Sequence, residues 1–307
     1  MQATLEHSVT FEGIGLHSGR PARLVVKPAP AGYGVKFERM DVKIGERIVE
    51  ARWDAVELDQ LCTKVVNADG VEVSTIEHVM AALAGCGIHN AHLEIDGPEV
   101  PILDGSAAPF VQTFLETGRT WLDAPVWAIR VLREVEVTRG EAWAKLVPAD
   151  EMKIDFSIDF EDAAIGRQHK ALRMANGSFV RELCDSRTFC RQSDVDAMRA
   201  AGKALGGTYE NAVVVDGADV LSPGGLRHAD EAVRHKMLDA LGDLALAGAP
   251  IFGEYRGSRS GHALTNLLLR ELFSAEGAFC FVRCTEEMAA RLPGAGVHLG
   301  ELPGKAA

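Results

Sequence analysis

The chain has 307 residues, of which 47% are apolar and 25% are charged. These values are typical of a globular protein that buries a substantial core, and the length suits two ordinary domains or one large domain. The formal net charge of −12 argues against nucleic-acid binding, because no basic block is present to neutralise phosphates. An anionic small molecule held by a few local Lys or Arg residues is still compatible with this balance.

Signals for export or membrane insertion are not visible in the sequence. Residues 1–13 lack a basic region followed by an apolar region, so no secretory signal is expected. No apolar run approaches the ~18 residues of a membrane helix, so no transmembrane segment is expected. The six cysteines form no C-x-x-C pair and are expected to be reduced thiols. Together these features predict a cytoplasmic enzyme, and the sequence implies no protein partner.

The first half of the chain has the pattern of strands followed by helices. Residues 1–60 alternate between apolar and polar positions and are interrupted by Pro and Gly, as expected of short strands. His17 lies in a glycine-rich turn at residues 13–19 and is interpreted as a surface residue. A helix is expected at residues 107–117, and the first domain is expected to span residues 1–122.

Another helix is predicted at residues 74–85. Ser74 and Glu77 fit the S-x-x-E pattern of a capping box, which would be a complete structural explanation for Glu77 and competes with any catalytic one. His78 follows in the first turn, where the helix dipole favours a neutral imidazole that can bind a metal.

A second domain of similar style is expected at residues 126–302, followed by a tail at residues 303–307. Its predicted strands lie at residues 126–137, 142–147, 153–160, 211–216, 251–255 and 279–283. Its predicted helices lie at residues 193–201, 228–248 and 261–273.

The segment at residues 228–248 has one apolar face and one polar face at helical spacing. The polar face carries side chains four residues apart: His235, Asp239 and Asp243. The simplest interpretation is a solvated face. Alternatively, His235 and Asp239 bind one metal ion from successive turns, as the two histidines of an HExxH helix do. Two ligands do not complete a site, so a third must come from elsewhere in the chain.

A short similarity relates the two halves. His78-x-Met80 and His235-x-Met237 each begin a helical pattern that continues with Ala-Leu, and the two histidines are 157 residues apart. This similarity suggests two similarly built halves that each present a helix and a histidine to a shared cleft. The expected fold class is therefore α+β.

His78 is a candidate for the missing third ligand beside His235 and Asp239. Three protein ligands with one open position are typical of catalytic rather than structural zinc. Such an ion lowers the pKa of water and polarises a carbonyl, and Glu77 would be placed to take the proton of that water. Amide hydrolysis also requires a proton donor for the leaving amine. His262 is the candidate donor, with Asp243 orienting it.

Five segments, in this order along the chain, together resemble the UDP-3-O-acyl-N-acetylglucosamine deacetylase family, the zinc amidases of lipid A synthesis. They are Ser74-Thr75-Ile76-Glu77-His78, residues 101–110 (PILDGSAAPF), Arg187-Thr188-Phe189, residues 233–239 (VRHKMLD) and residues 260–263 (SGHA). The resemblance extends from residue 12 to about residue 266 and implies two similar α+β domains, each a β-sheet packed against helices, with the active site between them.

The resemblance also implies specific roles for residues of this chain. One zinc ion per chain would be bound by three ligands: His78, His235 and Asp239. Glu77 would act as the general base and His262 as the general acid, supported by Asp243. Thr188 would stabilise the oxyanion, Lys236 would contact the substrate, and Phe189 would pack against the sugar. The substrate would be an acylated UDP-sugar whose acetamide is hydrolysed to release acetate.

Family members carry an inserted βαβ piece, expected here at residues 189–215, whose apolar side chains line a passage for the substrate's acyl chain. The candidates for this lining are Val195, Met198, Leu205, Tyr209 and Val214, and the alternative is that they are ordinary core residues. Cys190-Arg191 and Arg259 depart from the usual family pattern, which affects the expected shape of the passage. Cys62 resembles a family position near the site, with a small buried hydrophobe as the alternative.

Two rival functions are compatible with the same residues. One is a zinc amidohydrolase that acts on a different N-acyl sugar and does not require the 3-O-acyl chain. The other is a structural zinc protein or a sugar-nucleotide-binding protein in which Glu77 only caps its helix.

Overall fold

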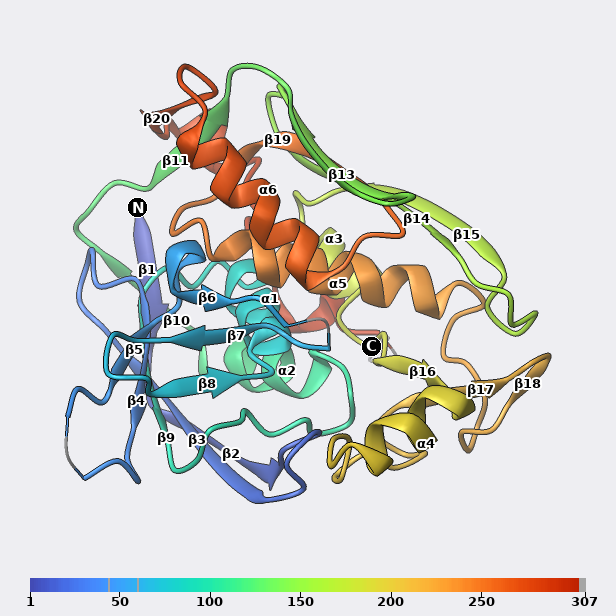
Figure 1. The fold of residues 1–307 in the computed structure, drawn as a ribbon. Helices are drawn as coiled ribbons and strands as arrows, with labels where there is room; N and C mark the ends of the chain where they lie inside the picture. The colour runs from blue at the N-terminus through green and yellow to red at the C-terminus, as the bar shows by residue number, and fades with distance from the viewer. Residues whose placement is uncertain (44, 60, 304–307) are drawn as a thin grey trace.

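The computed structural model describes residues 1–43, 45–59 and 61–303. It is a mixed α and β structure in which several sheets pack against helices, so the predicted α+β class is confirmed (Figure 1). Residues 304–307 of the predicted tail lie outside the described residues.

One five-stranded sheet dominates the first half of the chain. In spatial order its strands are β2 (Val9–Ile14), β3 (Pro21–Pro28), β9 (Ala91–Ile95), β4 (Val35–Arg39) and β5 (Ile48–Glu50). The central strand β9 pairs antiparallel with β3 and parallel with β4. Leu24 and Val26 of β3 are fully buried, which agrees with the predicted alternation of apolar and polar residues.

The second half repeats this arrangement in a larger sheet. Its matching strands are β12 (Val135–Arg139), β13 (Ala142–Val147), β19 (Ile251–Ser258), β14 (Met152–Asp159) and β15 (Arg167–Arg173). Strand β19 pairs antiparallel with β13 and parallel with β14, as β9 does with β3 and β4. Two further strands, β11 (Trp127–Val131) and β20 (Phe279–Arg283), extend the sheet through the pairing of β11 with β19. The predicted continuous strand at residues 126–137 is wrong, because its two ends join this sheet at different places.

Each central strand is preceded and followed by a helix. Helix α1 (Glu77–Gly85) precedes β9 and α2 (Ala108–Thr117) follows it. Helix α5 (Glu231–Ala245) precedes β19 and α6 (His262–Ser274) follows it. The two halves therefore share strand order, strand direction and helix placement, which gives the short similarity around His78 and His235 a structural basis.

Helices α1 and α5 pack directly against each other in the middle of the molecule (Figure 1). Gly242 of α5 permits this close approach, because a Cβ atom at that position would lie 2.1 Å from the backbone oxygen of Glu77. The close packing brings the first turn of α1 against the helix that carries His235, Asp239 and Asp243.

The predicted capping box at the start of α1 is wrong. The helix begins at Glu77, and its N-cap residue Ile76 makes no side-chain capping bond. Ser74 belongs instead to strand β8 (Glu72–Ser74), and its hydroxyl donates to the backbone oxygen of Pro98. Pairing of β8 with β7 (Lys64–Val66) holds Ser74 in an extended conformation, so the tertiary ladder outweighs the local capping signal. Glu77 therefore has no capping role.

A small separate unit projects from the second half. It contains β16 (Phe189–Arg191), α4 (Gln192–Ala200) and β17 (Val213–Asp216), with β16 and β17 paired in parallel, followed by β18 (Asp219–Val220). The remaining short strands and α-helices of the described residues are β1 (Gln2–Leu5), β10 (Arg119–Leu122), β6 (Val56–Glu57), α3 (Ser178–Glu182) and α7 (Glu286–Ala289).

The pairing of strands is compatible with the predicted division of the chain into two domains. Within the described residues, no ladder joins a strand of residues 1–122 to a strand of residues 126–302. The exact domain boundaries stay a prediction. Among the described helices, none is long and apolar enough to cross a membrane. All six cysteines are free thiols.

Candidate active site

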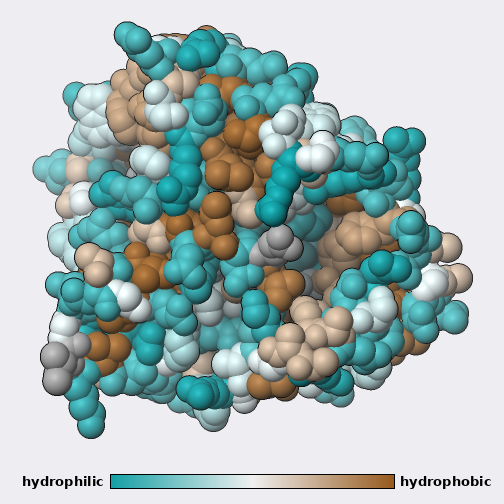
Figure 2. Space-filling view, viewed as in Figure 1, coloured by the Kyte–Doolittle hydropathy of each residue, from teal (hydrophilic) through white to brown (hydrophobic). Residues whose placement is uncertain are grey.

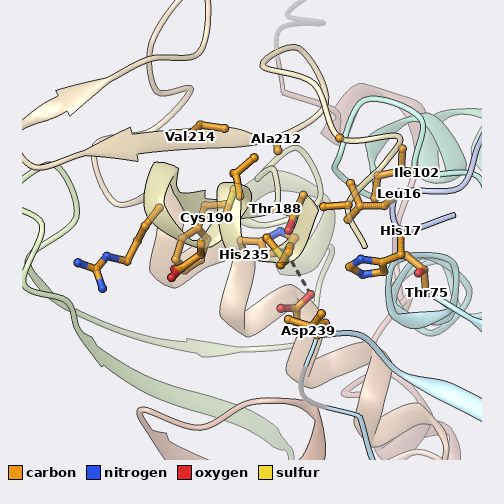
Figure 3. Close-up of a pocket in the computed structure, with 18 of the residues that line it drawn as sticks. Leu16, His17, Thr75, Ile102, Thr188, Cys190, Ala212, Val214, His235 and Asp239 are labelled. Atoms are coloured by element: carbon orange, nitrogen blue, oxygen red, sulfur yellow. Dashed lines mark ion pairs between the residues drawn. The ribbon is translucent and has the colours of Figure 1, made fainter. Parts of the chain in front are cut away.

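The three predicted metal ligands meet where α1 packs on α5. Nε2 of His235 lies 3.2 Å from Oδ1 of Asp239, and Nε2 of His78 lies 3.7 Å from the same oxygen. One ligand atom from each residue lies within 4.8 Å of the others, and all three side chains are buried. Figure 3 shows His235 and Asp239 on successive turns of one helix.

The chemistry of this donor set fits a zinc ion. Nδ1 of His235 lies 2.9 Å from the backbone oxygen of Ser186, so Nδ1 serves as the donor and Nε2 keeps its lone pair. Oδ1 of Asp239 is buried and has no hydrogen-bond partner among the described residues, a costly state for a carboxylate unless a cation binds it. Burial and the neighbouring His235 lower the pKa of His78 to about 3, and burial also lowers the pKa of His235. Both imidazoles are therefore neutral, as metal ligands must be.

Glu77 lies beside this cluster, with its side chain 4% exposed in the folded chain. Its Oε2 accepts a hydrogen bond from the backbone N–H of Thr63, and its Oε1 lies 4.0 Å from Nε2 of His262. Burial raises the pKa of Glu77 to about 7, although the charge of His262 opposes the shift. A carboxylate with a pKa near neutrality is suited to accepting and releasing a proton.

His262 begins α6 and is oriented by a carboxylate from α5. Its Nδ1 lies 2.9 Å from Oδ2 of Asp243, whose other oxygen accepts the hydroxyl hydrogen of Thr63. Burial alone lowers the pKa of His262, but the charges of Asp243 and Asp239 outweigh burial and raise this pKa to about 9. Its Nε2 is therefore protonated, and this atom faces Glu77 and the predicted metal ligand Asp239.

Three other predicted residues surround the cluster. Nζ of Lys236 lies 2.8 Å from Oδ2 of Asp239, and this ion pair leaves Oδ1 free on the other side of the carboxylate. The ring of Phe189 contacts the ring of His235 edge-on, with centroids 6.2 Å apart. Thr188 lies beside His235 in Figure 3 and lines the same space.

This space is a cavity of about 900 Å³, which is in the size range of small-molecule sites. Figure 2 shows a hollow on this face of the molecule, with apolar side chains on its walls. Of the predicted passage residues, Val195, Met198, Tyr209 and Val214 line the cavity. Leu205 is not among its lining residues and is 55% exposed. Cys62 is buried and does not line it either, which favours the alternative of a small core residue for Cys62.

His17 was interpreted as a surface residue, but the structure places it in the cavity wall. Both of its ring nitrogens are buried, and neither has a hydrogen-bond partner in the part of the chain that the structure describes. Buried Glu99 fixes this turn, because its carboxylate accepts the backbone N–H groups of His17 and Ser18 and the hydroxyl of Thr75. Thr75 and His17 enter the cavity from the first half of the chain, whereas Cys190 and Val214 enter from the second (Figure 3). Leu16, Ile102 and Phe160 are further lining residues that the sequence analysis did not identify.

A second group of candidate ligands lies elsewhere, on the outer face of the five-stranded sheet. Its members are Glu38, His92 and Glu94. Lys27 pairs with Glu94 and Arg47 pairs with Glu38, so neither carboxylate needs a metal ion for charge compensation. This group is a much weaker metal site than the buried cluster.

Comparison with known proteins identifies one family for most of this chain. The model of the UDP-3-O-acyl N-acetylglycosamine deacetylase family matches residues 2–274. The chain belongs to this family. The family resemblance expected from the five sequence motifs is thereby confirmed.

Similar proteins come from several bacteria. A UDP-3-O-acyl-N-acetylglucosamine deacetylase of Phenylobacterium zucineum is 46% identical over 288 residues, which cover 94% of this chain and 98% of the relative. The proteins of the same name from Shewanella violacea and Anaeromyxobacter sp. are each 44% identical. The alignments cover 91% of both chains for the first and 93% of both chains for the second.

Proposed function

We propose that this protein is a zinc-dependent deacetylase of the cytoplasm. It hydrolyses the acetamide of UDP-3-O-(3-hydroxyacyl)-N-acetylglucosamine and releases acetate, the committed step of lipid A biosynthesis. The single observation that carries the proposal is the buried cluster of His78, His235 and Asp239, whose unpartnered carboxylate oxygen lies beside a large cavity. Membership of the deacetylase family supports the choice of substrate.

His78, His235 and Asp239 would hold the zinc ion. Bound zinc supplies a Lewis acid that lowers the pKa of water toward ~7 and polarises a carbonyl oxygen. The lone pairs of the two neutral imidazoles and the free oxygen of Asp239 supply the donor atoms that zinc prefers.

Glu77 and His262 would carry the two proton transfers of amide hydrolysis. Glu77 takes the proton of the attacking water as the new C–O bond forms at the acetyl carbon. His262, protonated at Nε2, gives its proton to the sugar nitrogen as the C–N bond breaks. Asp243 keeps the imidazole of His262 in its orientation and stabilises its charge.

The cavity walls would bind the rest of the substrate. The hydroxyl of Thr188 would donate to the oxyanion, and the charge of Lys236 would attract the anionic substrate. Phe189 would pack against the sugar ring. The apolar residues Val195, Met198 and Val214 would contact the acyl chain, which explains why one wall of a site for a charged nucleotide sugar is apolar.

The deciding experiment is acetate release from the acylated UDP-sugar by the purified protein, before and after removal of metal with a chelator. Activity that is lost with the metal and regained with zinc supports the proposal, whereas undiminished turnover of the metal-free protein overturns it. The same assay with UDP-N-acetylglucosamine, which lacks the 3-O-acyl chain, separates this function from an amidohydrolase for other N-acyl sugars. Equal turnover of both substrates favours that rival function, and no acetate from either favours a non-enzymatic binding protein.

A further inference from the structure

We infer that Glu231 is a positioning residue for the reaction, acting through Arg187 to hold Thr188 at a fixed place relative to the metal ligands of α5. The inference rests on the proposed function, because it assumes that Thr188 stabilises the developing oxyanion. Glu231 does not line the cavity and has no contact with the space where the substrate would lie.

Glu231 lies in the first turn of α5 and is 1% exposed. Its carboxylate accepts three hydrogen bonds from Arg187: from the backbone N–H at 3.0 Å, from Nε at 2.9 Å and from Nη2 at 3.1 Å. It accepts a fourth from the backbone N–H of Arg227 at 2.7 Å. Both oxygens are used, so the carboxylate and the guanidinium have a single mutual orientation.

One turn further along α5, His235 holds the same segment. Its Nδ1 lies 2.9 Å from the backbone oxygen of Ser186, the residue before Arg187. Glu231 and His235 are four residues apart and therefore lie on one face of the helix. Side chains on this face bind two consecutive residues, Ser186 and Arg187, of the segment that ends in Thr188. Helix α5 therefore fixes the position of Thr188 relative to the proposed metal ligand His235.

The other attachments of Thr188 do not lead to α5. Its N–H donates to the backbone oxygen of Gly105, and its own backbone oxygen accepts the N–H of Val213 in β17. These two bonds join Thr188 to the first half and to the projecting unit. The Arg187–Glu231 pair, together with the bond from His235 to Ser186, thus links the position of Thr188 to the helix of His235 and Asp239.

The energetics of the pair also point to positioning rather than to stability. A buried ion pair contributes little net stability, because the cost of desolvating two charges offsets their attraction. A bidentate pair with further backbone donors does fix geometry closely, and a displacement of about 1 Å at a reacting group can reduce the rate about 100-fold. A pair that only stabilised the fold would affect Thr188 and every other cavity residue alike.

The test is a double-mutant cycle on kcat with Glu231→Gln and Thr188→Val. Glutamine preserves size and one acceptor oxygen, but its amide group turns a donor toward the donors of Arg187. We expect Glu231→Gln to lower kcat about 10- to 100-fold with KM changed less than threefold, and to lower kcat less than threefold when Thr188 is already valine. Equal losses in both backgrounds would assign Glu231 a structural role and overturn the inference.

A matched control is Asp230→Asn at the N-cap position, immediately before Glu231 at the start of α5. Asp230 pairs with Arg234 and Lys170 and makes no bond to the segment at residues 186–188, so this variant should keep kcat within threefold of the wild type. Zinc content and the unfolding midpoint of each variant are measured alongside. Should Glu231→Gln not fold, Arg187→Lys replaces it in the cycle. Lysine keeps both buried charges but cannot make the paired hydrogen bonds of the guanidinium.

Failure of the inference is distinguishable from failure of the proposed function. If the wild-type protein releases no acetate, the proposed function fails. If it does and the cycle is additive, only the positioning role fails.

Discussion

His262 and Asp243 share a hydrogen bond of 2.9 Å although they come from different helices, α6 and α5. Asp243 lies one turn beyond Asp239, so a single helix carries a proposed metal ligand and the carboxylate that orients His262. Thr63 of the first half donates its hydroxyl to the other oxygen of Asp243 and its backbone N–H to Glu77. One threonine therefore joins Glu77 to the His262–Asp243 pair across the two halves.

Asp243→Asn should reduce kcat about 100-fold, because the amide no longer stabilises the charge of a protonated His262. Zinc binding should be unchanged, since Asp243 is not among the three clustered ligand residues. Steady-state acetate release and metal analysis measure the two effects. A variant that keeps wild-type kcat would remove Asp243 from the mechanism.

Glu77→Gln should reduce kcat by about 10²- to 10⁴-fold while leaving folding intact. The side-chain oxygen of glutamine can still accept the N–H of Thr63, so the contact between residue 77 and Thr63 is preserved. Because Glu77 makes no capping bond, a structural role would predict a change in stability rather than in turnover. Thermal unfolding with zinc bound and single-turnover kinetics distinguish these outcomes, and near-normal turnover would contradict the general-base role.

Zinc should stabilise the folded protein, since the three proposed ligands are buried and come from both halves of the chain. A ligand that binds only the native state adds about 2.7 kcal/mol at 100 times its dissociation constant. The unfolding midpoint of metal-free protein should therefore rise with added zinc, and Asp239→Asn should abolish most of this rise. His92→Asn serves as the control, because the weaker group on the outer sheet should contribute none of the shift. An unchanged response of the Asp239 variant would mean that zinc binds elsewhere.

Much of this site could be predicted from the sequence because its signals are local. The spacing of His235, Asp239 and Asp243 on one helix face depends only on helical periodicity, and α5 has that helix. The proposed third ligand, His78, was inferred with the help of the repeated pattern around it, which the matching topology of the two halves explains. His78 meets His235 and Asp239 because α1 packs closely on α5. Gly242 permits this packing because it has no side chain, and no local sequence pattern reveals that contact.

The wrong predictions concern positions where contacts between distant parts of the chain determine the local structure. The capping signal of Ser74 and Glu77 was overridden by the pairing of β7 with β8. His17 belongs to the cavity because Glu99, 82 residues away, holds its turn. Glu99 was the residue that could have placed His17 in the cavity wall. The two residues are far apart along the chain, so no local sequence pattern connects them. Leu205 was predicted to line the passage, but it is 55% exposed and is not among the residues that line the cavity.

Stability should fall in mildly acidic solution because of His89. Its Nδ1 accepts the backbone N–H of Ala3, and burial, aided by the positive charge of the N-terminus, lowers its pKa from 6.5 to about 4. Between these values the unfolded chain binds a proton that the folded chain does not, so stability decreases as pH falls from about 6.5 to about 4 and is retained above this range.

His89→Asn removes this titration while keeping an acceptor near Nδ1. Between pH 7 and pH 4.5, the wild type should therefore lose roughly 2 kcal/mol more of its free energy of unfolding than the variant loses. Urea unfolding at both pH values measures the difference, with His7→Asn at an exposed position as the control. Parallel pH dependence of wild type and His89→Asn would show that the folded protein protonates His89 freely.

The width of the cavity at Val214 should control which acyl chains are accepted. Val214 is buried on β17 and lines the cavity, so Val214→Phe would narrow the space that we assign to the acyl chain. We expect KM for a long-chain substrate to rise about 10-fold, which corresponds to about 1.4 kcal/mol of lost binding. A substrate with a short acyl chain should be affected less than threefold, and it also reports any general loss from overpacking. Leu205→Ala, outside the cavity, should leave both KM values unchanged. If Val214→Phe raises both KM values equally, or if Leu205→Ala reproduces its selectivity, the acyl chain does not occupy this part of the cavity.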